Sequence, residues 1–459
     1  MTMTHLIRHC EGAKRPKQSI FRLLRPFGAR NDVVLFLSIF FVLHIFSAEA
    51  FALSSDEQFL DKIEYDSILY FVKEMNPASG LIKDSSRPGS PASVAATGFG
   101  LTAICVGESR GWIAKEDAYY LVLKTLKTFR DTVPNEKGFF YHFLDMRTGQ
   151  RAWSSEVSSI DTALFLAGAL FAGEYYKGSE AETIARELYE RVEWPWMLNG
   201  KKVLCMGWKP ENGFLPYYWD SYSEAMILYA LAIGSPTHPI PAEYWFEWKR
   251  PVDSYKDYKA IYCTTGSIFT YQYSHAWIDF RELYEDDINY FNNSVSAVKA
   301  NRQFCIDNSD AYKTYGEDSW GLSACLGPDG YRGYGAKPGL GFNDGTIPPC
   351  GIAGSMPFDP IASLNGLKRL YAEHKDFLYG KYGFKDAFNL DKNWWSEEYL
   401  GIDVGITILM IENYRSGFVW NKFMSISAVK SWISKCFNKA ISEEETASAP
   451  NAFANGSSQ

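Results

Sequence analysis

The chain lacks the features that mark several large protein classes. It has no Gly-rich phosphate loop, no nucleophile elbow between a strand and a helix, and no His-Glu-x-x-His motif, so it does not indicate a P-loop enzyme, an α/β-hydrolase or a zincin. It has only 8 cysteines in 459 residues, and their spacings match neither a zinc site nor a dense disulfide framework, although one or two bridges could form. Alternating polar and apolar residues never persist long enough to predict a sheet. A mainly helical globular protein remains.

The chain also lacks an excess of positive charge. Its formal net charge is −8, and the first 52 residues carry seven basic and three acidic side chains, so the rest of the chain carries about −12. An acidic body of this kind argues against nucleic acid as a partner.

The apolar run at residues 33–46 is shorter than the about 20 residues of a membrane span. Basic residues precede it, and Ala48, Ala50 and Ala52 follow it, which is the pattern of a signal peptide. We therefore expect residues 1–52 to direct export, with cleavage near Ala50 or Ala52. An uncleaved N-terminal anchor is the alternative, and only then would the protein contact a membrane. Either way the protein is expected to be secreted or periplasmic.

Helical patterns then follow one another, separated by loops rich in Gly, Pro and aromatic residues. The predicted helices are residues 56–74, 93–107, 115–131, 158–176, 180–193, 221–233, 275–290, 292–305, 359–374 and 402–414. We expect one catalytic domain over residues 53–430. The remaining tail, residues 431–459, is expected to be largely disordered, because its Glu-, Ala- and Ser-rich end has little to bury.

Two of the predicted helices contain stretches that are apolar on nearly all sides. Residues 94–101 and 162–170 mix apolar side chains with Gly and Ala, which is typical of a helix surrounded by protein. The helices at 115–131 and 180–193 are more polar. An inner ring of apolar helices inside an outer ring of polar ones accounts for both kinds, so we predict an all-α fold of the (α/α) barrel type.

Aromatic residues make up 16% of the chain and gather in the predicted loops. Sugar rings have flat C–H faces that pack on aromatic rings, so these loops favour a saccharide cleft. The candidate substrate contacts among them are Trp208, Trp219, Tyr222, Tyr331 and Trp394. The alternative for each is packing of a loop on the core.

Acidic residues stand at two similar helix starts, residues 153–161 and 219–224. Ser158 with Asp161, and Ser221 with Glu224, have the spacing of a capping box, so both acids could simply cap helices. In a barrel, however, the starts of the inner helices line one open end and direct acidic side chains into the cavity.

Glycoside hydrolysis requires a protonated carboxyl group that gives a proton to the leaving oxygen and a carboxylate that activates water or attacks the sugar. The aromatic neighbours of Glu224 would raise its pKa by desolvation, whereas the helix dipole would lower it. Our hypothesis is that Glu224 is the acid. Asp161 and Glu156 are the candidates for the complementary role, directly or through a water or a substrate hydroxyl.

His142 and His275 both lie among aromatic residues. Each could donate a hydrogen bond to a sugar hydroxyl or be an internal structural histidine. Asp279, in the same segment as His275, is a further candidate contact. The adjacent acids at residues 285–287 are more typical of a solvated helix face than of a calcium site, so we predict no metal.

Short motifs spread over residues 63–424 carry a family resemblance. They include Gly98-Phe99-Gly100-Leu101, Tyr141-His142-Phe143, Ser155-Glu156-Val157-Ser158-Ser159-Ile160-Asp161-Thr162, Met206-Gly207-Trp208-Lys209-Pro210, Tyr222-Ser223-Glu224, Gln272-Tyr273-Ser274-His275-Ala276-Trp277-Ile278-Asp279 and Ile411-Glu412-Asn413. Read in order, they resemble the glucoamylase-like domain family, which includes bacterial β-1,2-glucanases and the middle domain of cyclic β-1,2-glucan synthases.

The resemblance implies an (α/α)6 barrel, hydrolysis or transglycosylation of a glucan, and no cofactor. It also implies that the positions matching Glu224 and Asp161 are important for activity. The sequence departs from the characterised glucanases, which have Glu-Thr at Asp161-Thr162 and more acids upstream, where this chain has only Glu156. The shorter Asp161 side chain changes the geometry available for activating water.

The leading hypothesis is an exported glucan hydrolase acting on β-1,2-glucan, with an α-glucan or another β-glucan as alternative substrates. A glucan transglycosylase and a non-catalytic glycan-binding protein are the alternative functions. The Gly-rich stretch at residues 327–345 is the candidate lid over the cleft.

Overall fold

The computed structural model describes residues 54–439, in which helices dominate and every strand is two to four residues long. The α-helices are α3 (Ser55–Lys73), α4 (Val94–Ser109), α5 (Lys115–Asp131), α6 (Ser159–Tyr175), α7 (Glu180–Glu190), α8 (Met226–Gly234), α9 (Tyr290–Asp307), α10 (Pro349–Ala353), α11 (Pro360–Leu378), α12 (Gly401–Ser416), α13 (Phe418–Phe423) and α14 (Ser427–Cys436). By internal contacts the chain divides after Ile63: residues 54–63 form the start of α3, and the second unit holds all the other elements. The predicted, mainly helical fold is confirmed.

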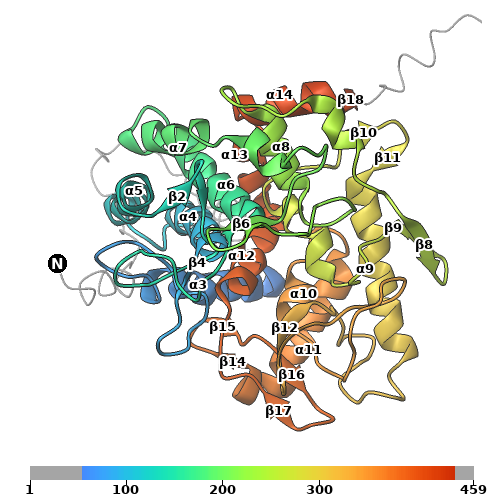
Figure 1. Ribbon diagram of the computed structural model, residues 1–459. Coiled ribbons are helices and arrows are strands. Elements are labelled where there is room, and N and C mark those ends of the chain that lie inside the picture. The colour runs from blue at the N-terminus through green and yellow to red at the C-terminus, as the bar shows by residue number, and fades with distance from the viewer. Residues whose placement is uncertain (1–53, 440–459) are drawn as a thin grey trace, which may run out of the picture. The chain divides into compact units, whose positions relative to one another are not determined.

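Four helices, α4, α6, α8 and α12, are buried on nearly all sides. α4 packs against both α6 and α12, and α6 packs against α8, so these helices lie side by side in the centre of Figure 1. The predicted burial of residues 94–101 and 162–170 is confirmed. By contrast, α5 and α7 bury one side only, as their amphipathic sequences predict.

The backbones of α4 and α6 touch where Gly98 meets Gly168. A Cβ atom on Gly168 would lie 1.9 Å from the carbonyl oxygen of Gly98, and one on Gly98 would lie 2.3 Å from the carbonyl oxygen of Leu164. Backbone atoms cannot move aside as a side chain can, so any larger residue would push the two helices apart.

Gly168→Ala is therefore expected to lower the free energy of unfolding by at least about 2–3 kcal/mol, the upper part of the range for an overpacked core. Chemical denaturation followed by circular dichroism measures this change. Gly316→Ala is the matched control, because nothing lies within 4 Å of its Cβ position. A Gly168→Ala variant as stable as the wild type would contradict the close approach of α4 and α6.

Short antiparallel strands fix the loops that precede the buried helices. β1 (Ala92–Ser93) pairs with β4 (Phe143–Leu144) and leads directly into α4. β5 (Val157–Ser158) pairs with β6 (Gly207–Lys209), which also pairs with β7 (Gly213–Phe214), and β5 leads directly into α6. The remaining strands are β2 (Asn135–Glu136), β3 (Phe139–Phe140), β8 (Val252–Tyr255), β9 (Tyr258–Ile261), β10 (Leu283–Glu285), β11 (Ile288–Asn289), β12 (Ala324–Gly327), β13 (Gly330–Gly333), β14 (Tyr379–Gly380), β15 (Gly383–Phe384), β16 (Phe388–Asn389), β17 (Trp394–Trp395) and β18 (Asn438–Lys439).

The predicted helix at residues 275–290 is wrong. The chain forms the short 3-10 helices η3 (Ile268–Tyr271) and η4 (Ser274–Ala276), followed by the hairpin of β10 and β11. Asp286 adopts φ 53° in the hairpin turn, a conformation that Asp tolerates better than most residues. The acids at 285–287 therefore do not form a solvated helix face, and Glu285 is buried in an ion pair with Arg250 at 2.9 Å.

The predicted C-terminal tail begins too early, because α14 continues to Cys436. The hydrophobic side of this helix, which includes Trp432, is buried, and this burial keeps it ordered. The predicted signal segment, residues 1–52, and the tail residues 440–459 lie outside the described residues. None of the helices within residues 54–439 has the length and hydropathy needed to cross a membrane. The seven cysteines in this part of the chain are buried free thiols.

Candidate active site

His142 lies between two acidic side chains. Its Nδ1 atom is 3.0 Å from Oε1 of Glu156, and its Nε2 atom is 3.5 Å from Oδ1 of Asp161. Local pairing creates this arrangement, because the backbone N–H of His142 donates to the carbonyl of Glu156 at 2.9 Å and β5 then carries the chain into the first turn of α6. The structure thus brings together three of the residues predicted from the sequence.

The charges of this group are mutually dependent. Burial alone would lower the pKa of His142, but the charge of Asp161, together with the hydrogen bond and charge of Glu156, raises it to about 9. The hydrogen bond from His142 lowers the pKa of Glu156 to about 2, against the effect of burial. The His142 contribution to stability is therefore present below its ordinary pKa of 6.5 and lost as the pH rises through about 9. The Glu156 contribution is present above 4.5 and lost as the pH falls toward about 2.

Asp161 is held by the residue that caps α6. The hydroxyl of Ser158 accepts a hydrogen bond from the backbone N–H of Asp161 at 3.2 Å and donates to Oδ2 of Asp161 at 2.5 Å. Ser158 is thus a helix cap, as the capping alternative predicted. The other carboxylate oxygen of Asp161 faces His142. Ser158 therefore caps α6 and at the same time orients a side chain of the candidate site.

Glu224 lies two residues before the first residue of α8, which begins five residues later than predicted. The cap position is Ala225, which makes no side-chain cap hydrogen bond, so the capping alternative is wrong for Ser221 and Glu224. Burial raises the pKa of Glu224 to about 7; a hydrogen bond from its own backbone opposes the rise and the charge of Asp161 adds to it. A carboxyl group that is still about half protonated at neutral pH therefore lies within the electrostatic influence of a second carboxyl group.

Two further acids form a buried pair that the sequence analysis did not identify. Asp403 lies in the first turn of α12 and is buried, with Asp386, Cys350 and Tyr273 near its carboxyl group. Burial raises the pKa of Asp403 to about 6 and raises the pKa of Asp386 well above its ordinary range. Two neighbouring acids that are both buried disfavour being charged at the same time.

Asp84 connects the two groups of acids. Burial raises the pKa of Asp84 to about 6; the charge of His142 opposes this rise, and the charges of Asp161 and Asp403 add to it. The sequence held a clue to Asp403, because this residue, like Asp161, lies in the first turn of an apolar helix. Asp84 follows no such pattern. Within residues 54–439, no group of three or more His, Cys, Asp or Glu side chains has the arrangement of a metal site.

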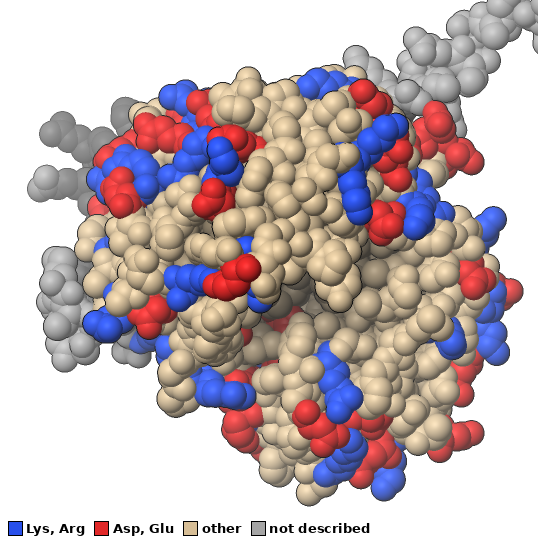
Figure 2. Space-filling model, viewed as in Figure 1, with Lys and Arg blue, Asp and Glu red and all other residues tan. Residues whose placement is uncertain are grey.

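A cavity of about 400 Å³ opens beside His142. Its polar wall residues include Asp84, Ser85, Arg87, His142 and Glu398, and its apolar ones include Phe143, Trp153, Leu326, Tyr331, Leu400 and Ile402. The face shown in Figure 2 is hollowed near its middle, and acidic atoms are visible inside the hollow. Glu156, Asp161 and Glu224 do not line the cavity themselves. Glu156 and Asp161 contact His142, which is a wall residue, and the charge of Asp161 acts on Glu224. Polar groups beside flat apolar ones suit the hydroxyls and C–H faces of a sugar.

Several other predicted contacts lie in the core. His275 is fully buried with its Nε2 atom 3.1 Å from the Ser294 hydroxyl, and burial lowers its pKa to about 3. It is therefore the internal structural histidine of the two alternatives. Tyr222 is 1% exposed, and Trp219 is 9% exposed with its indole N–H donating to the Ser159 hydroxyl. These three residues pack loops on the core, which is the alternative that the sequence left open.

Asp279, Trp208 and Trp394 are partly exposed but do not line the cavity. Asp279 is paired with Arg281 at 2.7 Å. Trp208 lies in β6 beside β5, and Trp394 lies in β17. Tyr331 alone among the predicted aromatic contacts is a wall residue, and 55% of it is exposed.

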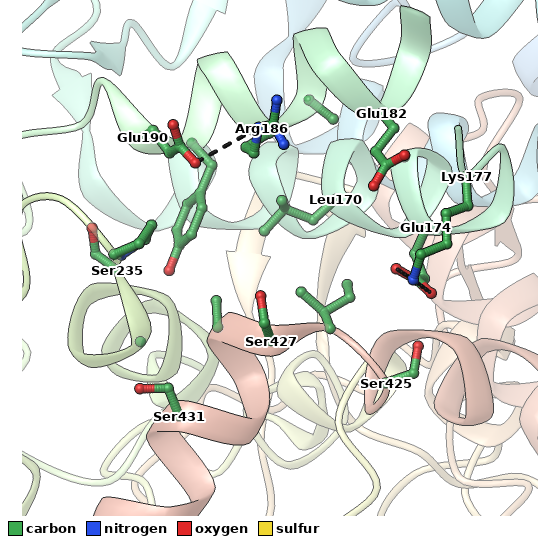
Figure 3. Close-up of a pocket in the computed structure, with 17 residues that line it drawn as sticks. Leu170, Glu174, Lys177, Glu182, Arg186, Glu190, Ser235, Ser425, Ser427 and Ser431 are labelled. Atoms are coloured by element: carbon green, nitrogen blue, oxygen red, sulfur yellow. Dashed lines mark hydrogen bonds and ion pairs between the residues drawn. The ribbon is translucent and has the colours of Figure 1, made fainter. Parts of the chain in front are cut away.

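A second cavity, of about 440 Å³, lies at the other ends of α6 and α8. Figure 3 shows its charged side chains, four of which form ion pairs: Lys177 is 3.0 Å from Glu174, and Arg186 is 3.8 Å from Glu190. None of the coupled acids described above lines this cavity. The cavity beside His142 is therefore the candidate active site.

Similar proteins are known. The family model described as "Putative glucoamylase" matches residues 216–427. The chain is 31% identical over 422 residues to the exo β-1,2-glucooligosaccharide sophorohydrolase (non-reducing end) of Parabacteroides distasonis; the match covers 83% of this chain but only 58% of that relative's length. The structure of the endo-β-1,2-glucanase from Chitinophaga pinensis, in complex with sophorotriose and glucose, is 30% identical with a TM-score of 0.78, over 84% of this chain and 99% of that chain. The β-1,2-glucanase structure from Parabacteroides distasonis is 29% identical with a TM-score of 0.79, over 84% of this chain and 60% of that chain.

Proposed function

Because this chain belongs to the glucoamylase-like family that includes bacterial β-1,2-glucanases, as its motifs predicted, we propose that it is a glycoside hydrolase that cleaves β-1,2-linked glucan. The observation that carries the proposal is the interaction of Glu224, whose pKa is raised to about 7, with Asp161, which is held by Ser158 and His142. One acid that keeps its proton and one carboxylate are the two groups that glycoside hydrolysis requires.

Glu224 is the general acid in this proposal. It gives its proton to the glycosidic oxygen as the bond between that oxygen and C1 breaks, and it becomes a carboxylate. Asp161 takes a proton from the attacking water, directly or through a substrate hydroxyl, as the water oxygen bonds to C1. One water is consumed for each bond cleaved, and proton exchange with solvent returns both groups to their starting states.

His142 and Glu156 position Asp161. The pKa of Glu156, about 2, makes it a weak proton acceptor near neutral pH, so it is better suited to holding His142 than to activating water. His142, whose pKa is about 9, is positively charged at neutral pH and faces the Asp161 carboxylate at 3.5 Å, which orients that side chain. We therefore assign Asp161 as the base and Glu156 as a positioning residue.

For the architecture, we infer an (α/α)6 barrel. Contacts between α4 and α6, α6 and α8, α10 and α12, and α12 and α4 support a ring of buried helices. The gap between α8 and α10 is bridged by η3 and η4: the Ser274 hydroxyl accepts from the backbone N–H of Ile227 at 3.0 Å, and the Gln272 amide donates to the carbonyl of Gly351 at 2.9 Å. A ring of parallel inner helices would bring the helix starts at Asp161, Glu224 and Asp403 to one end.

The rate of glucan cleavage is expected to fall as the pH rises above about 7. Glu224 must be protonated to act, so kcat/KM should decline about tenfold for each pH unit above its pKa of about 7. The measurement is the initial release of reducing ends from linear β-1,2-glucan over a pH series, with the folded fraction checked at each pH. A rate that stays constant well above neutral pH would contradict Glu224 as the acid.

We further propose that the protein is exported, to the periplasm or outside the cell, with the catalytic unit following residue 52. The basic segment, the apolar run and the Ala-x-Ala site within residues 1–52 support this proposal. A glucan oligosaccharide or polysaccharide is the proposed partner, which suits a substrate met outside the cytoplasm.

A further inference from the structure

The turn at residues 151–155 presents a large aromatic side chain to solvent beside the site. Trp153 and Ser154 have φ values of 54° and 50°, a left-handed conformation that residues other than glycine rarely adopt. Trp153 is 69% exposed, so the fold gains little from burying it. Two consecutive residues in this conformation, holding an exposed tryptophan at a cavity wall, point to a function for that side chain.

The turn is held in place from inside. The guanidinium group of Arg151 donates to the carbonyl of Ser155 at 2.5 Å and to the carbonyl of Ser154 at 2.8 Å. The same group pairs with Glu211 at 2.5 Å and lies over the ring of Tyr141, 5.1 Å from its centre. Arg151 is thus held by Glu211 and Tyr141, and it in turn binds two carbonyl groups of the turn. These contacts stabilise the conformation of the turn without a bound ligand.

Trp153 also belongs to a series of rings that leads to the site. Its ring centre is 5.0 Å from that of Phe143, and Phe143 stacks on His142 with centres 3.9 Å apart and planes 15° from parallel. All three residues, with Tyr331 from β13, are walls of the cavity of about 400 Å³. Because the whole Phe143 ring separates Trp153 from His142, a sugar on Trp153 is not the unit beside the acids.

We propose that Trp153 is the platform of an outer sugar subsite, which stacks on the C–H face of a glucosyl unit remote from the cleaved bond and so favours longer substrates. This inference rests on the proposed glucan hydrolysis. Stacking of this kind acts equally in the ground state and the transition state, so it lowers KM and leaves kcat unchanged. Arg151 is the residue that positions the platform.

The test compares Trp153→Ala, Trp153→Phe and the wild-type full chain on linear β-1,2-gluco-oligosaccharides of increasing length. Trp153→Ala should raise KM about five- to tenfold for the longer oligosaccharides, with kcat unchanged and no effect on the shortest one cleaved. Trp153→Phe should restore most of the loss. Tyr120→Ala is the matched control, because Tyr120 lies on α5 and is similarly exposed at 57%. Equal melting temperatures would show that each variant is folded.

Binding measured without turnover tests the role of Trp153 as a sugar platform separately from the proposed hydrolysis. Calorimetric titration of a long β-1,2-gluco-oligosaccharide into Glu224→Gln and into the Glu224→Gln, Trp153→Ala double variant should show a five- to tenfold weaker affinity for the double variant. Equal affinities of Glu224→Gln and the double variant would contradict the proposed role of Trp153 but not the proposed hydrolysis. The same dependence of KM on oligosaccharide length in Trp153→Ala and the wild type would do so too. A wild type that binds the oligosaccharide but cleaves none of the series would overturn the proposed hydrolysis and leave the platform standing.

Discussion

Replacing Glu224 with Gln is expected to lower kcat for glucan cleavage about 10³-fold. General acid catalysis contributes about 10²–10⁴-fold, and the amide of Gln has the same size as the carboxyl group but cannot give a proton to the leaving oxygen. The fold should survive, because Glu224 does not cap α8 and its raised pKa of about 7 shows that its site disfavours the charged form. The measurement is the initial rate of reducing-end release from linear β-1,2-glucan, together with the melting temperature.

Glu182→Gln makes the same chemical change in the second cavity, away from the coupled acids, and serves as the matched control. Its rate should equal that of the wild type. A Glu224→Gln variant that keeps more than about a tenth of the wild-type kcat would rule out the role of general acid, since no mechanism with that acid allows so small a loss.

Asp161→Asn is expected to lower kcat about 10²–10³-fold, because the amide cannot accept a proton from the attacking water. The start of α6 should remain intact, since Ser158 caps it through the backbone N–H of residue 161, which the substitution leaves in place. Asp220→Asn is the control: the side chain of Asp220 is 50% exposed and pairs with Lys249 at 3.1 Å. Initial rates of both variants on β-1,2-glucan give the comparison.

Asp161→Asn is also expected to change the pH dependence of the remaining activity. The charge of Asp161 adds to the raised pKa of Glu224, so its removal should lower that pKa. The decline of the remaining activity at high pH should therefore begin at a lower pH in Asp161→Asn than in the wild type. Wild-type kcat would show that Asp161 is not the base, and an unshifted decline would show that the two acids are not coupled.

The helices that the sequence predicted well are those whose apolar pattern is unbroken. The helix at residues 115–131 has the same bounds in the structure as in the prediction, because an amphipathic pattern begins and ends there. The start of α8 was misplaced because Ser221 and Glu224 have capping-box spacing, yet Ser221 forms a β-bridge with Lys249 that keeps this segment extended. Pairing with a distant segment of this kind cannot be predicted from the residues that surround Ser221 in the sequence.

The residues of the candidate site were likewise predicted well only where neighbouring segments of the chain supply them. His142, Glu156 and Asp161 could be predicted together because two neighbouring segments, joined by pairing of Tyr141 with Val157, supply all three. His142 and His275 have similar aromatic neighbours in the sequence, and only packing of distant segments makes one a wall of the cavity and the other a core residue.

The residues that the sequence analysis missed come from distant parts of the chain. Asp84 precedes α4, whereas Asp386 and Asp403 lie some three hundred residues later. The charge of Asp403 acts on Asp84 because α12 packs against α4. Burial and proximity, which raise the pKa values of these acids, are properties of the fold rather than of the sequence around each residue.

Incubation of the chain with linear β-1,2-glucan and, separately, with starch tests the central claim most directly. Reducing ends and product lengths are followed in both reactions. We predict shorter products and new reducing ends from β-1,2-glucan and none from starch, with the release abolished in Glu224→Gln. New oligosaccharides longer than the substrate would identify a transglycosylase instead, and release from starch alone, or from neither polymer, would contradict the proposed function.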